Sequence, residues 1–330
     1  MMHAVSAPRS AWLEGHVHDA CLQEVRAFKP GNVSVGAAGH GMSAEDFLRS
    51  AAAVAAPLTR RGQRVGVRIE EAIAATSRVV SCNTNLGIVL LMAPLLRAVE
   101  HSGGGATARA LRQALSEVLH DLDQDDAACA FRAICQAQPG GLGVRKEDDV
   151  HSAPSITLRE AMVRACAYDG IARAYADDYA TVFEIAYPEL RQAFETGMPE
   201  LWAIPRCFLA ILAHQGDGHV ERKHGKQTSR QVQAQAIALL ANWPAGMPVA
   251  QVWPGLRALD RAWKSAGINP GTSADLVAAT LLLVRLLEAD GYNSKSYTGA
   301  WPQPSTEGLR EGPATAAPGK REWALGSLNV

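Results

Sequence analysis

The chain has 330 residues, of which 48% are hydrophobic and 20% are charged, and its formal net charge is -1. This length allows one large domain or two ordinary ones with a sizeable core, and the composition is typical of a soluble globular protein. The near-zero charge excludes bulk electrostatic attraction to nucleic acid or to an anionic membrane, so any phosphate binding has to be local. The longest apolar run, residues 86–96, is too short to span a bilayer.

Apolar residues recur at helical spacing along most of the chain, and strand signals are nearly absent. The sequence therefore predicts an all-α protein with a single large multi-helix domain over residues 1–291. Residues 292–330 are rich in Pro, Gly, Ser and Thr, which predicts an extended or disordered C-terminal arm. The roughly one dozen expected helices cover residues 11–28, 44–60, 65–81, 85–101, 105–121, 125–137, 158–168, 171–196, 198–214, 227–242, 250–266 and 273–290.

Local signals refine this pattern. Ser43 with Asp46, and Thr157 with Glu160, have the spacing of capping boxes at helix N-termini. Two long polar stretches, residues 139–155 and 216–225, are expected to be loops. The second stretch reads GDGHVERKHG, and we interpret it as a basic loop placed against phosphates.

Three short, turn-like polar motifs separate apolar helical stretches: residues 29–34 (KPGNVS), 83–87 (NTNLG) and 269–275 (NPGTSAD). Proline fixes φ and glycine permits positive φ, so such turns can present backbone N–H groups in a fixed direction. Each is expected to precede a helix, whose N-terminus adds positive potential. The three motifs together predict a site for a polyphosphate.

Several side chains near these motifs have two interpretations. Lys29 is either a phosphate ligand or a solvated cation near a helix C-terminus. Glu24 either binds a metal or activates a hydroxyl, or it is a surface carboxylate. Asn83 and Asn85 precede a very apolar helix, and N-capping explains one of them but not both.

A second group of polar residues has helical spacing. Asp169, Arg173 and Asp177 are four residues apart and are expected on one helix face. They form either an exposed salt-bridged face or a set of carboxylates for Mg²⁺ with an arginine for phosphate. Asp275 is expected in the first turn of the last long helix, where it either complements the helix dipole or binds a metal.

Taken together, these residues resemble the triphosphoribosyl-dephospho-CoA synthase family, over about residues 20–290. The resemblance implies an all-α transferase of cofactor biosynthesis that joins ATP to 3'-dephospho-CoA and releases adenine, with Mg²⁺ as cofactor. The product is the precursor of the prosthetic group of citrate lyase or malonate decarboxylase. The matching residues are Glu24, Lys29-Pro30-Gly31, Asn83-Thr84-x-x-Gly87 and Pro270-Gly271-x-Ser273-Ala274-Asp275-Leu276.

The resemblance and the motifs together assign roles. Catalytic roles fall to Glu24, Asn83 and Asp275, and metal binding to Asp169, Asp177 and Asp275. Substrate binding falls to Lys29, Gly31, Asn32, Ser34, Asn85, Arg173, Arg222, Gly271 and Ser273.

The chain also departs from the citrate-lyase type, which has a basic residue where Asn85-Leu86 stands here. Residues 140–150 and 168–172 resemble a divergent archaeal and methylotroph-like branch. Three alternatives therefore stay open: transfer to a methanopterin-type precursor with ATP or phosphoribosyl diphosphate as donor, hydrolysis of related substrates, and a non-catalytic nucleotide-binding helical protein.

The remaining expectations concern location and partners. The six cysteines lie in apolar helical patterns without a Cys-x-x-Cys pair, and the N-terminus lacks a signal-peptide pattern, so a reduced, cytoplasmic protein is expected. Its partners are expected to be nucleotide and CoA-like or pterin-precursor small molecules, with no nucleic acid and no membrane. The Ala-rich helices would permit a homo-oligomer without requiring one.

Overall fold

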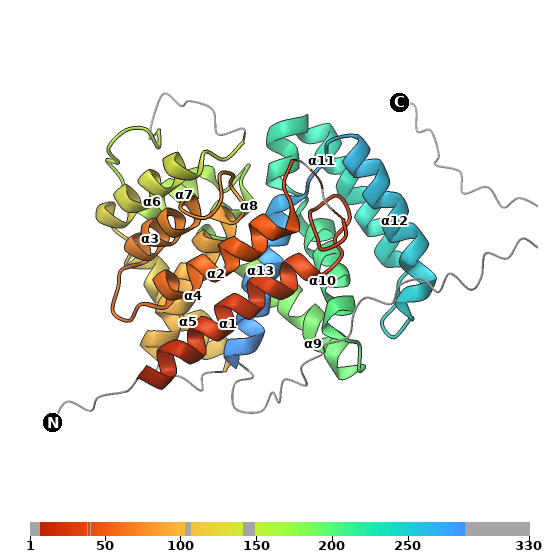
Figure 1. Ribbon diagram of the computed structural model, residues 1–330, viewed down its shortest axis with the longest axis horizontal. Coiled ribbons are helices and arrows are strands. Elements are labelled where there is room, and N and C mark those ends of the chain that lie inside the picture. The colour runs from red at the N-terminus through yellow and green to blue at the C-terminus, as the bar shows by residue number, and fades with distance from the viewer. Residues whose placement is uncertain (1–6, 38, 40, 103–106, 141–148, 288–330) are drawn as a thin grey trace, which may run out of the picture. The chain divides into compact units, whose positions relative to one another are not determined.

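The computed structural model describes residues 7–37, 39, 41–102, 107–140 and 149–287 (Figure 1). Within these ranges it contains thirteen α-helices and one π-helix without any β-strand, which confirms the all-α prediction. The expected C-terminal arm, residues 292–330, lies outside the described residues. The elements are α1 (Ala7–Arg26), α2 (Ala44–Thr59), α3 (Val65–Ser77), α4 (Leu86–Ser102), α5 (Ala108–His120), α6 (Gln124–Ala137), α7 (Leu158–Ala165), α8 (Gly170–Ala176), η1 (Thr181–Ala186), α9 (Tyr187–Glu195), α10 (Glu200–Gln215), α11 (Gly218–Ala241), α12 (Val249–Ser265) and α13 (Gly271–Leu287).

Helix starts follow the capping signals in the sequence. The box of Ser43 with Asp46 caps α2, and that of Thr157 with Glu160 caps α7, both with reciprocal side-chain to backbone hydrogen bonds. The C-terminus of α12 is followed by Gly267, whose φ of 68° is favourable for glycine. Local chemistry thus determines where α2 and α7 begin and where α12 ends.

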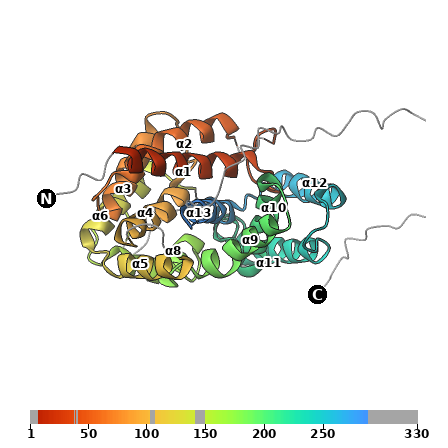
Figure 2. The ribbon, with the colours of Figure 1, turned by 90° about the horizontal axis from the view of Figure 1, so that it is seen from below.

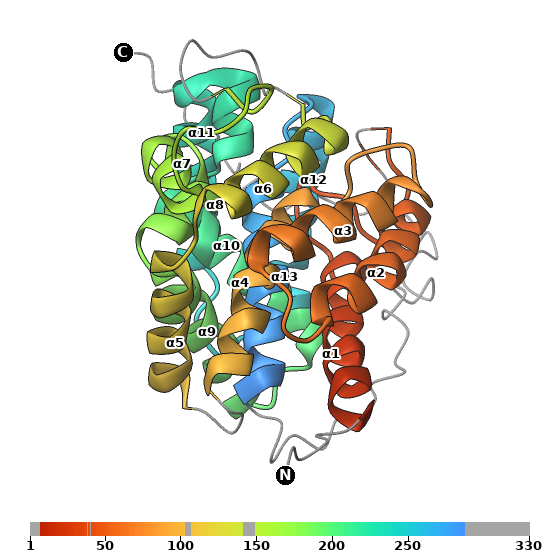
Figure 3. The same cartoon turned by 90° about the vertical axis from the view of Figure 1, so that its left-hand side faces the viewer.

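Helix α13 lies in the middle of the helices (Figure 2), with α4 alongside it (Figure 3). It contacts α1, α4, α8, α9, α10, α11 and η1. The sequence predicts a single buried stripe on this helix through Leu276, Ala279, Leu283 and Leu286. The structure buries residues on nearly every side of it, including Val277. A helix that is apolar all round is a central helix, and α13 is the element on which the surrounding helices pack.

The prediction of one continuous helix over 171–196 is wrong. The chain forms α8, then a turn in which Asp178 and Tyr179 have φ of 52° and 58°, then η1 and α9. The hydroxyl of the fully buried Tyr179 donates to the carbonyl oxygen of Leu91 at 2.9 Å, and that of Tyr175 to the carbonyl oxygen of Leu90. These buried hydroxyls need hydrogen-bond partners, and the partners are on α4, which fixes the turn. Local helix propensity contains no information about these distant partners, so the sequence pattern did not predict the turn.

The prediction of a loop over 216–225 is also wrong. Asp217 caps α11, and residues 218–224 form its first turns before a kink at Gly225, whose φ is 84°. The polar composition of this segment is typical of a loop. Most of these residues are also compatible with a solvent-exposed helix once an N-cap residue is present. His219 and Arg222 therefore sit on a helix rather than on a loop.

None of the described helices has the length and apolar character that crossing a bilayer would need.

Candidate active site

Two of the three turn motifs contact each other directly. The side-chain amide of Asn32 donates to Oδ1 of Asn269 at 2.8 Å. Gly31 has a φ of 76°, and a Cβ atom there would lie 3.1 Å from both the carbonyl oxygen of Ile268 and Cδ of Pro270. The first turn therefore requires glycine because it packs tightly against the third turn.

The second and third motifs meet at Gly87 and Asp275. A Cβ atom at Gly87 would lie 2.1 Å from Oδ2 of Asp275, well inside van der Waals contact. The second motif precedes α4 and the third runs into α13, as expected. The first motif does not precede a helix, because α2 begins only at Ala44. All three motifs are nevertheless brought to one place.

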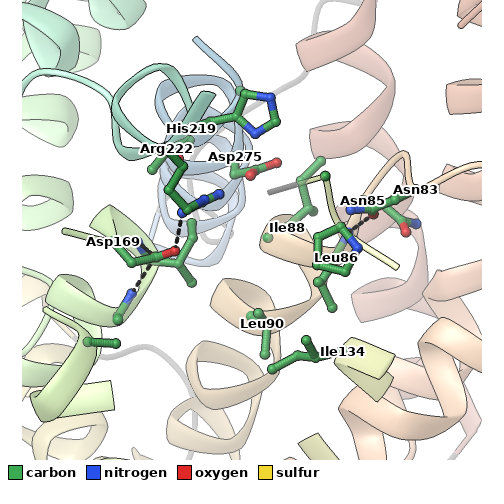
Figure 4. Close-up of a pocket in the computed structure, with 18 of the residues that line it drawn as sticks. Asn83, Asn85, Leu86, Ile88, Leu90, Ile134, Asp169, His219, Arg222 and Asp275 are labelled. Carbon is green, nitrogen blue, oxygen red and sulfur yellow. Dashed lines mark hydrogen bonds and ion pairs between the residues drawn. The ribbon is translucent and has the colours of Figure 1, made fainter. Parts of the chain in front are cut away.

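That place is a cavity of about 560 Å³ (Figure 4). Its wall includes residues from the first turns of α4, α8, α11 and α13. Unsatisfied N–H groups and the helix dipole make helix N-termini favourable places for anions. Polar side chains that line the cavity are Glu24, Asn32, Asn83, Thr84, Asn85, Asp149, Arg164, Tyr168, Asp169, His219, Arg222, Asn269, Thr272 and Asp275.

Glu24 contributes to this wall from α1 and is paired with Lys29. The ammonium group of Lys29 lies 3.0 Å from Oε1 of Glu24 and also donates to the carbonyl oxygens of Glu24 and Ala27. Lys29 is fully buried and does not line the cavity. Burial raises the pKa of Glu24 and lowers that of Lys29, and the attraction between the two charges opposes both changes. The three N–H donors of the Lys29 ammonium group are thus used within the fold. A direct phosphate contact by Lys29 stays a prediction.

We expect Lys29→Met to lower the free energy of unfolding by about 3–5 kcal/mol, because it leaves the Glu24 carboxylate buried without its partner. Adding Glu24→Leu should recover most of that loss, since the unpaired charge is then removed. Urea denaturation of the two variants and the parent measures this. An unchanged unfolding free energy together with weaker nucleotide binding would instead favour direct phosphate binding by Lys29.

Asp275 lies on α13 at the start of its second turn rather than in its first, because the helix begins at Gly271, two residues earlier than predicted. No hydrogen bond to its carboxylate comes from the residues that the structure describes. Burial raises the pKa of Asp275 well above its usual range, and the negative charge of Glu24 adds to this effect. A carboxylate with a raised pKa is a stronger base than an ordinary aspartate, which suits it to proton exchange.

Arg222 and Asp169 form an ion pair at the opposite wall of the cavity from Asn83 (Figure 4). Oδ1 of Asp169 caps α8 by accepting from the amides of Ile171 and Ala172 at 2.8 and 3.1 Å. The other carboxylate oxygen accepts from Arg222 on α11. Asp169 therefore holds Arg222 at the cavity and has little capacity left for a metal.

Asp177 and Arg173 do not share a cavity-facing surface with Asp169. Asp177 lies beyond the end of α8 and accepts from the amide of Ala180 at 3.1 Å. Arg173 donates to the carbonyl oxygen of Cys166. Neither lines the cavity: Arg173 lies within α8 but is turned to Cys166, and Asp177 follows the end of α8 at Ala176.

Asp217 is a residue whose importance the sequence did not single out. It is 2% exposed, and its Oδ1 accepts from the amides of His219 and Val220. Its Oδ2 accepts from both the amide and the hydroxyl of Ser273, each at 2.8 Å. Asp217 thus ties α11, which presents His219 and Arg222, to α13, which presents Asp275. Its position directly before a helix was the available signal.

Ser273 has a structural role in this arrangement, because it donates to the buried carboxylate of Asp217. The stability of the fold is therefore expected to depend on the protonation state of Asp217. Burial raises the pKa of Asp217 from an ordinary 3.8 to about 6. The folded protein therefore binds this proton more tightly than the unfolded chain does. The stability that the group provides is fully present below its ordinary pKa and is lost as the pH rises through the folded value.

We expect Ser273→Ala to be less stable than the parent by about 1.5–3 kcal/mol at about pH 8, where Asp217 is ionised and the hydroxyl donates to a charge. At about pH 5 the deficit should shrink to about 1 kcal/mol or less, because the carboxyl is then mostly protonated. Urea unfolding at both pH values measures the difference. Equal deficits would show that the hydroxyl does not stabilise the ionised form.

The cavity brings together eight of the residues singled out in the sequence, and six others lie outside its lining. Those that line it are Glu24, Asn32, Asn83, Asn85, Asp169, Arg222, Gly271 and Asp275. Those outside the lining are Lys29, Gly31, Ser34, Arg173, Asp177 and Ser273. His219 and Asn269 also line it, and both belong to polar motifs visible in the sequence.

The sequence matches the family described as ATP:dephospho-CoA triphosphoribosyl transferase over residues 10–294. The chain belongs to this family. This confirms the resemblance inferred from the three motifs, and the motifs that meet at the cavity all lie within the matched residues.

Two relatives of this family member are named 2-(5''-triphosphoribosyl)-3'-dephosphocoenzyme-A synthase. One from Pectobacterium atrosepticum is 27% identical over 231 residues, covering 69% of this chain and 66% of that protein. One from Vibrio cholerae is 26% identical over 239 residues, covering 72% of this chain and 70% of that protein. The alignments thus span about two thirds of the length of these curated relatives.

A solved structure from Archaeoglobus fulgidus, described as a triphosphoribosyl-dephospho-CoA synthase, has a TM-score of 0.58 to this transferase-family chain. The match covers 74% of this chain and 98% of the other, at 20% sequence identity. At this identity the likeness establishes a shared fold.

Proposed function

We propose that this protein transfers the triphosphoribosyl group of ATP to a hydroxyl of 3'-dephospho-CoA and releases adenine. Family membership and the names of the relatives support this activity. The observation that supports its location is the carboxylate of Asp275, which has no hydrogen-bond partner among the described residues and lies in a cavity walled by helix N-termini. Neither transfer to a methanopterin-type precursor nor a non-catalytic role gains support from the family match or the relatives.

In this reaction a bond forms between the acceptor oxygen and C1' of the ATP ribose while the bond from C1' to N9 of adenine breaks. The electron pair of the broken bond leaves with adenine, and in the net reaction the hydroxyl proton ends on the free base. Positive charge develops on the ribose in the transition state. The carboxylates of Glu24 and Asp275 line the cavity where they can stabilise that charge.

Asp275 is the proposed acceptor of the hydroxyl proton. Its pKa is raised well above the ordinary value by burial, so its carboxylate is a stronger base than a solvated aspartate. The absence of a hydrogen-bond partner among the described residues leaves both oxygens available for the acceptor hydroxyl. Close packing on Gly87 holds the carboxylate in one position.

The triphosphate is proposed to lie against Arg222 and His219 and the first turn of α13 at Gly271. The guanidinium of Arg222 is held by Asp169, and backbone N–H groups of the helix start add positive potential. Oδ1 of Asn83 accepts from the amide of Leu86 at 3.1 Å, which leaves its amide nitrogen as a donor for ribose or phosphate.

Asn85 is proposed to position the start of α4 rather than to bind substrate alone. Its side-chain amide donates to the hydroxyl of Thr76 at 3.0 Å, and this pair links α4 to α3. The sequence could not explain two asparagines by capping. In the structure Asn83 is the residue whose side chain accepts from the start of α4, and Asn85 is anchored to the neighbouring helix.

Mg²⁺ is part of the proposal. The described residues contain no group of three or more side chains suited to hold a metal by themselves. A magnesium-triphosphate complex does not require one, since Mg²⁺ is commonly held by one or two carboxylates plus substrate phosphates. Glu24 and Asp275, which both line the cavity, fit that need, and the ion would neutralise charge on the triphosphate. Asp169 is engaged by Arg222, and Asp177 is outside the cavity.

The test is to incubate the purified protein with ATP, Mg²⁺ and 3'-dephospho-CoA and to analyse the products by mass spectrometry. Free adenine together with a CoA species heavier by one triphosphoribosyl group is the expected result. A reaction without acceptor is the control, and adenine released there at the same rate would indicate a hydrolase. No adenine under either condition would refute the proposed activity.

A cytoplasmic location is also proposed. All six cysteines are in described residues and all are free thiols, as expected for a reducing compartment. A homo-oligomer stays a prediction.

A further inference from the structure

The cavity has two chemically different parts. Its polar part contains Asp275, His219 and Arg222, and Figure 4 shows Leu90 and Ile134 at a distance from this group. We call the second part the apolar chamber. It is formed by Leu90 of α4, Phe131 and Ile134 of α6, Leu158 and Met162 of α7, and Ile171 of α8.

We propose that the apolar chamber binds the adenine base of ATP, the group that the reaction releases. This inference rests on the proposed function, since it assigns one part of the donor to one part of the same cavity. It excludes the two groups of the acceptor that such a chamber could also hold, the pantetheine arm and the acceptor's own adenine.

The position of the chamber relative to Asp275 favours the base. Gly87 contacts the Asp275 carboxylate, and Leu90 follows three residues later on the same helix. At 1.5 Å per residue, the chamber begins about 4.5 Å along the axis from the proposed reaction centre. The adenine of ATP is bonded directly to C1', the carbon at which the new bond forms. The acceptor's own adenine is carried by the ribose with the reacting hydroxyl, one bond further from the reaction, and the pantetheine arm is separated from that hydroxyl by a ribose and a diphosphate. The position therefore excludes the arm and favours the base on the reacting carbon.

The chemistry of the lining agrees with a purine. Leu90, Phe131 and Met162 are each less than 9% exposed, so the chamber is enclosed by packed apolar side chains. Such a lining contacts the two faces of a flat aromatic ring and excludes water from that side of C1'. The polar edge of the base can turn toward Arg164 and Tyr168, which line the same cavity next to the chamber.

The experiment fills the chamber and compares two ligands that share the triphosphate but differ in the base. Ala161 lines the cavity on α7 and is partly exposed, so Ala161→Leu adds bulk to the chamber at a position that tolerates it. Val163→Leu is the matched control, because Val163 is 43% exposed on the same helix and is outside this cavity. Affinities for ATP and for inorganic tripolyphosphate, both with Mg²⁺, are measured by calorimetry.

We expect the parent and Val163→Leu to bind ATP about tenfold or more tightly than tripolyphosphate, because the base adds contact. Ala161→Leu should lose that advantage and keep its tripolyphosphate affinity. If Ala161→Leu kept the full ATP advantage, or raised only the KM for 3'-dephospho-CoA, the base would lie elsewhere and the inference would be wrong. A parent protein that shows the ATP advantage but releases no adenine would refute the proposed function while leaving this assignment standing.

Discussion

Asp275→Asn is expected to lower kcat/KM for adenine release by about 100- to 10,000-fold, the usual range for removing a general base. The substitution preserves shape but removes the ability to accept a proton. Because burial raises the pKa of Asp275, its ionisation disfavours the folded state as the pH rises. The amide cannot ionise, so the variant should be at least as stable as the parent, increasingly so at alkaline pH. Steady-state kinetics and thermal unfolding on the same preparation test both parts.

Magnesium titration separates the two roles that Asp275 could have. If Asp275 accepts the proton, raising the Mg²⁺ concentration leaves the variant slow. If Asp275 acts only by binding the ion, excess Mg²⁺ restores much of the rate. The variant then binds Mg²⁺ less tightly, but a high Mg²⁺ concentration still fills the site. Full activity in Asp275→Asn at ordinary Mg²⁺ would remove this residue from the mechanism.

Gly87→Ala is expected to reduce kcat/KM by at least about 100-fold, because the added methyl group must displace a carboxylate that acts in proton transfer. The new Cβ would lie 2.1 Å from Oδ2 and 2.6 Å from Cγ of Asp275. The helix itself gains from alanine, whose helix propensity exceeds that of glycine by about 1 kcal/mol. The expected result is therefore a folded and inactive protein, measured by circular dichroism and adenine release.

Gly15→Ala provides a matched control for this substitution. Gly15 also lies in a helix, α1, and no atom lies within 4 Å of a Cβ placed there. The same change should leave activity unaltered and raise the unfolding free energy by about 0.5–1 kcal/mol. If Gly87→Ala were as active as Gly15→Ala, Asp275 would have room to move and its exact placement would not matter for turnover.

These variants differ in how far the sequence alone could have suggested them. Asp275 was visible in a Gly-Thr-Ser-Ala-Asp motif, and its family resemblance gave it a role. Gly87 was part of a matching motif, but the physical reason for glycine there was not visible, because it arises from a contact between residues separated by 188 positions that only packing creates. The same holds for Asp217, whose partner Ser273 is on another helix.

The sequence by itself determined the helical character, most helix boundaries and the three polar motifs. These depend on local physics: residue spacing, capping side chains and the special backbone freedom of glycine and proline. They are short-range signals, so they can be read without knowing the partners of each helix.

Only the tertiary structure decided which polar residues share the cavity. Lys29 is turned inward to Glu24, and α8 ends at Ala176, so the expected helical face does not continue beyond Asp177. Both outcomes follow from the need of buried polar groups for hydrogen-bond partners. Lys29 finds its partners where the chain turns back on itself, and the hydroxyls of Tyr175 and Tyr179 find theirs on α4, far away in the sequence. Because that demand arises only when helices pack, the composition of the site was predictable in part, and its geometry was not.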